Sequence, residues 1–559
     1  MANPGEGALV ETRGHLFVID GDLTKIACDA WLLPTDSHFD ITNSWAHIFP
    51  GDRLVRERVG DKRYQYLNGC TWPVDKLGCV IKYGTIDGSD VYLANIGHVA
   101  ADPKVYSGAV LEFIRLATEG FAGKGRRPRL AINQIGSGHG GGKQVRGGIL
   151  DHLILTLETE LNAGRITADV VLASWGEKAE AAAQYLRLDG QQDSYVTSAQ
   201  WHFDNSNLDL HARARDLALH FKARNACIFM GAGVSGGAGL PMWSELLRGL
   251  ATGTLLAANT EFAAADVLSK ASMLKNELGA DGFAARIDEA LASPKYSLLH
   301  GLLSSLPCNE FITTNVEQLF EKAASSKERG ITILPSTEEQ HLIDRWLLKI
   351  HGCVSEPSSM VFTREDYDSS ISSRRALFGV LQAMLLTRHI VFVGYSLSDP
   401  DFLEIVQEVN DALPQSGAGE AGGRKLGTVL TLFTDSSPDP LVNRLFDIVP
   451  ISSGTKEEAT TVQFETAVRD LERFIDLIGM LSSDRAAFLL DSRYSALLSP
   501  DEQYLARSLA SVVENAEQFA SSSGWDQVWD LLRSLGAHPN LIGADRPHVL
   551  ADVLHRSSM

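Results

Sequence analysis

Short apolar runs alternate with segments of helical periodicity along the first 185 residues of the chain. Continuous apolar runs are typical of strands buried in a parallel sheet, whereas apolar residues three or four positions apart indicate helices. The predicted strands are 15–19, 30–33, 91–96 and 129–135, and the predicted helices are 106–120 and 147–162. This pattern predicts an α/β domain over residues 1–187 and a polar linker over residues 188–208.

A second and longer α/β series follows the linker. Its predicted strands are 226–230, 310–313, 347–350, 389–393 and 428–433, and its predicted helices are 243–257, 260–275, 295–305, 316–325 and 375–387. Strands that alternate with helices indicate a parallel sheet with right-handed crossover connections. We therefore expect a Rossmann-like parallel-sheet domain over residues 209–455, with a glycine-rich surface loop at 415–425.

Strand patterns end near residue 456, and the rest of the chain has helical periodicity. The predicted helices are 463–480, 485–497, 501–519 and 525–535. The last of these has an apolar face formed by Trp525, Val528, Trp529, Leu531 and Leu532. Two interpretations of residues 456–559 stay open: a helical cap on the preceding domain, or an oligomerisation surface that makes the protein a homo-oligomer.

Composition narrows the class of protein. Fifty basic and seventy acidic side chains among 559 residues give a formal charge of −20, which argues against direct binding of nucleic acid. The six cysteines form no C-x-x-C pair, so zinc-finger and redox spacings are absent from the sequence. Scattered cysteines, a first segment unlike a signal peptide and the lack of a long apolar run predict a cytoplasmic protein without a membrane segment.

The predicted strand 226–230 runs directly into the glycine-rich sequence Gly231-Ala232-Gly233-Val234-Ser235. Glycine has no Cβ to hinder the approach of a phosphate to backbone N–H groups. Such a turn at the end of a parallel strand therefore predicts a dinucleotide site. An ordinary tight strand–helix turn is the alternative for a motif of this kind taken alone.

Three later motifs also follow predicted strands. They are Thr313-Thr314-Asn315-Val316-Glu317, Leu348-Lys349-Ile350-His351-Gly352 and Val393-Gly394-Tyr395-Ser396-Leu397-Ser398-Asp399-Pro400-Asp401. With the glycine-rich turn, these ordered motifs resemble the sirtuin-like NAD-binding domain over roughly residues 209–455. They are most similar to such domains in bacterial antiphage-defence proteins, which commonly carry T-T-N-Y-D, K-L-H-G and G-Y-S-x-x-D-x-D and hydrolyse NAD rather than deacetylate lysine.

The resemblance implies two catalytic residues, Asn315 and His351. Asparagine offers a donor and an acceptor without charge, and histidine suits proton transfer or ribose-hydroxyl activation near neutral pH. The residues expected to bind NAD are Gly231, Ala232, Gly233, Ser235, Thr314, Glu317, Gly394, Ser396 and Asp399. Purely structural alternatives are an N-cap at Asn315, a packed loop histidine at His351 and an Asx-type turn at Asp399.

The sequence departs from the family pattern in ways that bear on its chemistry. Glu317 stands where the family usually has aspartate, so a contact to the nicotinamide amide is displaced by one methylene group. Trp243 lies where deacetylases carry an Asp-Phe-Arg run. Deacetylase sirtuins usually hold zinc with two C-x-x-C pairs, whereas Cys353 stands alone here. We therefore expect no zinc, and water rather than an acyl-lysine as the acceptor.

The N-terminal domain resembles macro domains through Gly21-Asp22-Leu23-Thr24 and the following Asp29, which matches an acidic residue that contacts adenine in that family. A second glycine-rich loop, expected to form an anion nest, supplies Gly136, Ser137, Gly138 and Gly140, with Lys143 and Arg146 nearby. Pro34-Thr35-Asp36 replaces the catalytic asparagine-rich segment. The resemblance implies a second nucleotide site at Asp22, Asp29 and this loop without catalysis; a flexible loop is the alternative.

These expectations combine into an α/β multidomain protein: an N-terminal macro-like α/β domain, a Rossmann-like sirtuin-like domain and a C-terminal helical region. The leading functional hypothesis is an NAD⁺ glycohydrolase that depletes NAD during phage infection, with NAD as substrate. The N-terminal domain would sense an ADP-ribose-like ligand or restrain the catalytic site, and a defence partner such as an ATPase is a further expectation. Alternatives are a protein deacylase or ADP-ribosyltransferase, and a non-catalytic ADP-ribose or NAD sensor.

Overall fold

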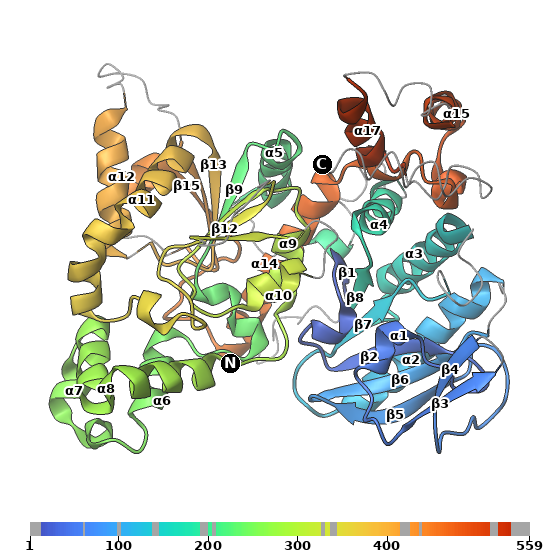
Figure 1. The fold of residues 1–559 in the computed structure, drawn as a ribbon, viewed down its shortest axis with the longest axis horizontal. Helices are drawn as coiled ribbons and strands as arrows, with labels where there is room; N and C mark the ends of the chain where they lie inside the picture. The colour runs from blue at the N-terminus through green and yellow to red at the C-terminus, as the bar shows by residue number, and fades with distance from the viewer. Residues whose placement is uncertain are drawn as a thin grey trace, which may run out of the picture. The chain divides into compact units, whose positions relative to one another are not determined.

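The structure is a computed structural model of the whole chain. It describes residues 13–59, 62–97, 102–136, 145–189, 199–203, 208–325, 330–335, 344–397, 399–413, 425–434, 439–514 and 524–537. The chain divides into two compact units, each with its own sheet (Figure 1). The first unit is Met1–Thr24, Cys28–His202 and Ser483–Met559, and the second is Lys25–Ala27 and Phe203–Ser482.

The first unit is built on a six-stranded sheet with the order β1-β8-β7-β2-β6-β5. Its strands are β1 Leu16–Asp20, β2 Ala30–Thr35, β5 Val80–Ile86, β6 Ser89–Asn95, β7 Arg129–Asn133 and β8 Asp169–Ser174. All neighbours are parallel except β5 and β6. A separate antiparallel hairpin consists of β3 Leu54–Val59 and β4 Lys62–Leu67. The predicted strands are present, whereas β3, β4, β5 and β8 were not predicted.

The described helices of the first unit are α1 Asn43–Ala46, α2 Pro103–Phe121, α3 Arg146–Asn162, α4 Glu177–Asp189, α15 Pro500–Glu514 and α17 Trp525–Ser534. Of these, α2, α3 and α4 pack against the sheet. Alternate strand residues such as Leu32 and Ile132 pack with Phe113 of α2 and Leu153 of α3 in one buried cluster. The opposite strand faces, which include Trp31, are buried as well, as expected for a central parallel sheet.

The second unit contains a seven-stranded, wholly parallel sheet with the order β11-β12-β10-β9-β13-β14-β15. Its strands are β9 Ala226–Met230, β10 Glu310–Thr313, β11 Thr332–Leu334, β12 Trp346–Lys349, β13 His389–Val393, β14 Gly427–Thr431 and β15 Phe446–Pro450. The predicted parallel sheet is therefore confirmed. The two edge strands, β11 and β15, were not predicted.

The helices of the second unit lie around this sheet (Figure 1). They are α5 Leu210–Lys222, α6 Trp243–Ala251, α7 Thr260–Ala264, α8 Val267–Leu291, α9 Leu298–Ser305, α10 Leu319–Ser325, α11 Arg364–Thr387, α12 Pro400–Ala412, α13 Pro440–Leu445 and α14 Thr461–Ser482. Side chains of α11, α12 and α13 share a core with Phe229 and Phe392 of the sheet. A smaller core joins α6, α7 and α8 to Val316 and Phe362.

The predicted C-terminal helical region, 456–559, is divided between the two units. Helix α14 belongs to the second unit, where it contacts α5 and α9. Segment 485–497, expected as one helix, forms two 3₁₀ helices, Arg485–Phe488 and Ser492–Leu497. Phe488 and Tyr494 from these turns join the core of the first unit, because their aromatic side chains are buried there with α3 and α4.

Candidate functional site

Each of the four sequence motifs follows a strand of the seven-stranded sheet. These four strands are neighbours, and they end at the same level. Thr313 is in register with Met230 on one side and with Lys349 on the other, and Val393 is also in register with Met230. The residues that follow these strands therefore share the carboxyl edge of the sheet. From β9 the chain turns first towards β10 and later towards β13, and ligands of open α/β sheets bind at such a switch point.

The glycine-rich turn after β9 packs directly against the backbone of the loop after β13. The N–H groups of Gly231 and Gly233 donate to the carbonyl oxygens of Val393 and Gly394, each at 3.0 Å. A Cβ on Gly233 would lie 2.8 Å from the Cα of Gly394, and a Cβ on Gly394 would lie 2.7 Å from the nitrogen of Val234. Glycine is thus required at these positions because two loops approach each other closely, and these two N–H groups are engaged within the protein.

A matched pair of substitutions tests this contact. We expect Gly233→Ala to lower the stability of the second unit by about 1–3 kcal/mol, because its methyl group overlaps the backbone of Gly394. Gly236→Ala, in the same turn, should change stability by less than about 1 kcal/mol, because nothing lies within 4 Å of its added Cβ. Thermal unfolding of the two variants measures the difference, and equal melting temperatures would contradict the contact.

Asn315, directly after β10, has its amide group fixed by three acceptors. Its Nδ2 lies 3.2 Å from the Gly231 carbonyl oxygen, 3.1 Å from Ser235 Oγ and 3.0 Å from Glu317 Oε1. A carbonyl and a carboxylate can only accept, so the NH₂ group must face them and Oδ1 is left to meet a ligand. Asn315 does not cap α10, because the N–H of Leu319 is accepted by Glu317.

Glu317 is a buried carboxylate at the centre of this polar cluster. Its Oε1 accepts from the Ser235 hydroxyl at 2.6 Å and lies 3.8 Å from Nε2 of His300, a residue with 1% exposure. Burial alone would raise the pKa of Glu317, but His300, Ser235 and the Leu319 N–H outweigh it and bring the pKa to about 2. Glu317 is therefore ionised, and it holds Asn315 and the glycine-rich turn together.

His300 lies on α9 and was not found from the sequence. The hydroxyl of Ser297, the N-cap of that helix, lies 2.8 Å from His300 Nδ1 and donates to the Val234 carbonyl oxygen at 2.8 Å. The only sequence signal is the spacing Ser297-x-x-His300, which resembles a helix-capping pattern. The helix thereby connects to both the glycine-rich turn and Glu317.

His351 follows β12, and its imidazole ring contacts the carboxylate of Asp399. Its Nε2 lies 3.2 Å from Asp399 Oδ2, and the Tyr367 hydroxyl donates to the same oxygen at 3.1 Å. Burial raises the pKa of Asp399, but the hydrogen bond and charge of His351, with the Tyr367 hydroxyl, hold it below its usual value. Asp399 Oδ1 also accepts the N–H groups of Asp401 and Phe402, so Asp399 caps α12.

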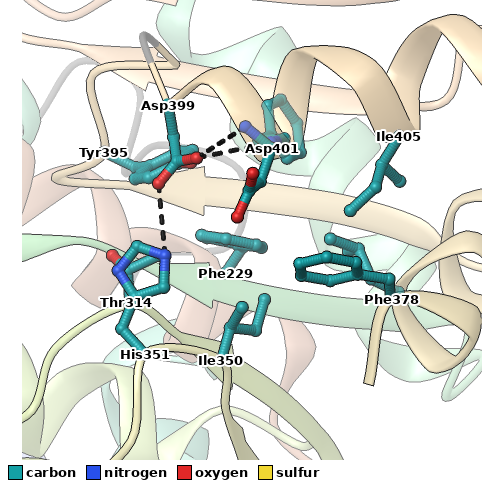
Figure 2. Close-up of a pocket in the computed structure, with 11 residues that line it drawn as sticks. Phe229, Thr314, Ile350, His351, Phe378, Tyr395, Asp399, Asp401 and Ile405 are labelled. Carbon is teal, nitrogen blue, oxygen red and sulfur yellow. Dashed lines mark hydrogen bonds and ion pairs between the residues drawn. The ribbon is translucent and has the colours of Figure 1, made fainter. Parts of the chain in front are cut away.

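A small pocket lies beside this contact between His351 and Asp399 (Figure 2). Its lining is mostly apolar: Phe229, Ile350, Phe378, Leu381, Phe402 and Ile405, with Thr314, His351, Tyr395, Asp399 and Asp401 as the polar members. Arg374 lies 3.2 Å from Asp401, and burial is the main cause that raises the pKa of Asp401. Thr314 and Asp399 from the predicted site thus meet His351 at this pocket, whereas Ser396 is exposed and does not line it.

In the second predicted nucleotide site, Asp29 does not lie at the same edge of the sheet as Gly136. Asp29 precedes β2, at the opposite edge of the first sheet from Gly136, which follows β7. Its carboxylate accepts from Arg126 at 2.7 and 3.0 Å and from the N–H of Arg129 at 2.8 Å. Asp22 follows β1 and accepts from the Thr24 hydroxyl at 2.7 Å. Ser137, Gly138, Gly140 and Lys143 lie outside the described residues.

Neither a metal-binding cluster nor a membrane-spanning helix is present in the described ranges of the chain. Within these ranges, no group of three or more His, Cys, Asp and Glu side chains is placed to hold a metal ion. No helix in the described part of the chain has the length and apolar character needed to cross a membrane.

Comparison with known proteins places the site within a family. Residues 309–433, which include Asn315, Glu317, His351 and Asp399, match the SIR2-like domain. The chain is similar to NAD(+) hydrolase ThsA of Enterococcus faecium, at 33% identity over 202 residues, and to NAD(+) hydrolase ThsA of Bacillus cereus (strain MSX-D12), at 30% over 209 residues. These matches cover 34% and 35% of this chain and 41% and 42% of the two relatives, so the chain spans about two fifths of their length. The chain therefore contains a SIR2-like domain, as its four motifs predicted.

Proposed function

We propose that this protein is an NAD⁺ glycohydrolase, which converts NAD⁺ and water to nicotinamide, ADP-ribose and a proton. The observation that carries the proposal is the arrangement of Asn315 and His351. They follow the neighbouring strands β10 and β12, which are in register at Thr313 and Lys349, at the switch point of the sheet. The names of the similar proteins, NAD(+) hydrolases, support the same reaction.

The reaction separates the ribose C1′ from the nicotinamide nitrogen, and the electron pair of that bond leaves with nicotinamide. Positive charge develops on the ribose, so groups that hold its hydroxyls and carry partial negative charge favour the transition state. Asn315 Oδ1 is suited to accept from a ribose hydroxyl or from the attacking water, because its Nδ2 is occupied within the protein. His351 is suited to take the proton that water loses.

The remaining predicted contacts are part of this proposal. Ala232, Ser235 and Thr314 would face the NAD phosphates and ribose from the first two motifs, and Gly394 and Ser396 would do so from the fourth. Gly231 and Gly233 would line the site without donating to NAD, because their N–H groups donate to Val393 and Gly394. We place the enzyme in the cytoplasm, as a homo-oligomeric antiphage-defence effector that works with a partner such as an ATPase. An ADP-ribose-like ligand bound by the N-terminal macro-like domain would regulate it.

Incubation of the purified full chain with NAD, followed by mass analysis of the products, tests the activity. Hydrolysis predicts nicotinamide and ADP-ribose in equal amounts, without peptide, in assays with and without ADP-ribose-type nucleotides or phage lysate as triggers. Nicotinamide release that requires an acyl-lysine peptide would indicate a deacylase, and ADP-ribose attached to protein would indicate a transferase. Tight NAD binding without nicotinamide release under any of these conditions would support a sensor and overturn the proposal.

A further inference from the structure

His351, which follows β12, is contacted by the side chains of Asp399 and Tyr367 from later segments of the chain. Asp399 stands at the start of α12, and Tyr367 lies on α11. His351 Nε2 and the Tyr367 hydroxyl both contact the same oxygen of the Asp399 carboxylate, Oδ2. Figure 2 shows Asp399 directed at the imidazole ring across the pocket. Asp399 was expected to contact NAD, yet its carboxylate is directed to protein groups: Oδ2 to the histidine and tyrosine, and Oδ1 to two N–H groups of α12.

We propose that Asp399 is a positioning residue that fixes the orientation and tautomer of His351, with Tyr367 as its second support. This inference rests on the proposed NAD⁺ hydrolysis. A carboxylate beside Nε2 requires that nitrogen to carry the proton, which leaves Nδ1 as the lone-pair acceptor. Among the described residues, Nδ1 of His351 has no hydrogen-bond partner, so it is available to take the proton of the attacking water.

The electrostatic surroundings of His351 agree with this arrangement. Tyr367 on α11 contacts the imidazole ring edge-on, with ring centroids 5.6 Å apart, and Thr314 beside it is uncharged. Asp401, the other nearby carboxylate, is paired with Arg374 of α11, so its charge is offset. Asp399 is thus the anion in direct contact with the ring, and its lowered pKa keeps it ionised over the range in which enzymes are assayed.

Because Asp399 is the N-cap of α12, a substitution by another N-cap residue can change its contact with His351 and still preserve the helix start. Asn and Ser are both good N-cap residues, so Asp399→Asn and Asp399→Ser should preserve the start of α12. Asparagine can cap the helix with Oδ1 and would then present an NH₂ group to His351, which favours the opposite tautomer. Serine removes the contact with the imidazole altogether because its side chain is shorter.

The test compares kcat and KM for NAD in the full-length protein. Both Asp399 variants should lower kcat by about 100-fold or more and change KM by less than about threefold, because the substrate contacts remain. Tyr367→Phe should lower kcat by a smaller factor, about two- to tenfold.

Asp439→Asn is the matched control. Asp439 caps α13 in the same manner, with Pro440 next and the N–H groups of Leu441 and Val442 as donors, and it belongs to none of the site motifs. This variant should leave kcat and KM unchanged. An Asp399→Asn enzyme with wild-type kcat and a raised KM would overturn the positioning role and restore Asp399 as an NAD contact. A wild-type protein that releases no nicotinamide would instead refute the proposed function.

Discussion

Asn315→Asp is expected to lower NAD turnover by about 10³-fold or more. The change is nearly isosteric, but it replaces the donor Nδ2 with an oxygen that faces Glu317 Oε1, 3.0 Å away in the native protein, and the Gly231 carbonyl oxygen at 3.2 Å. Two carboxylates at this distance cannot both stay ionised in a buried position, and neither can donate to the other without a shared proton. The new side chain must therefore leave the position from which Asn315 Oδ1 meets the substrate. Nicotinamide release under saturating NAD measures the loss.

The double variant Asn315→Asp, Glu317→Gln provides the control for this charge conflict. The glutamine amide restores a donor opposite the new carboxylate, so the double variant should recover at least about tenfold in turnover over Asn315→Asp alone. Circular dichroism should show the same fold in all three proteins. Near wild-type turnover in Asn315→Asp would mean that the amide orientation inferred for Asn315 is wrong.

Glu317→Gln alone is expected to destabilise the second unit by about 3 kcal/mol at neutral pH. The folded pKa of about 2 lies more than two units below the usual glutamate value, and each unit corresponds to about 1.4 kcal/mol. Because the folded pKa is depressed, this stabilisation is complete above about pH 4.5 and is lost as the pH falls towards 2. The melting-temperature difference between wild type and variant should therefore shrink over that range.

Glu404→Gln makes the same change of charge at an exposed position of α12. It should alter stability by less than about 0.5 kcal/mol at any pH in that range. A Glu317→Gln protein as stable as wild type at pH 7 would show that the buried carboxylate does not hold the polar cluster together.

The sequence predicted the central strands of the second unit well, because continuous apolar runs bounded by polar or glycine residues mark them. The observed bounds of β9, β10 and β13 equal the predicted ones. Edge strands were missed for physical reasons: β11 has three half-buried residues, and β15 ends in Pro450 and has three half-buried residues among its five. In the C-terminal region, helical periodicity identified helices but could not show that α14 and the later segments belong to different units.

Site residues that follow a strand end were predicted from the sequence. Site residues that are recognised only by contacts between distant segments were missed. Asn315 and His351 stand directly after β10 and β12, so the motif order was enough to find them. His300 lies within the apolar helix α9 and reaches Glu317 only in three dimensions. The contact of His351 with Asp399 likewise joins segments that lie far apart in the sequence, which gives no sign of it.

The hydrogen bond from Gly233 to Gly394 has a consequence for biosynthesis. The glycine-rich turn is made early, whereas the loop that receives its N–H groups and the carboxylate beside His351 are made only after β13. Until that strand has left the ribosome and joined the sheet, the turn has neither its acceptor nor its packing surface. A nascent chain is therefore unable to complete the site until β13 and the loop after it have been made.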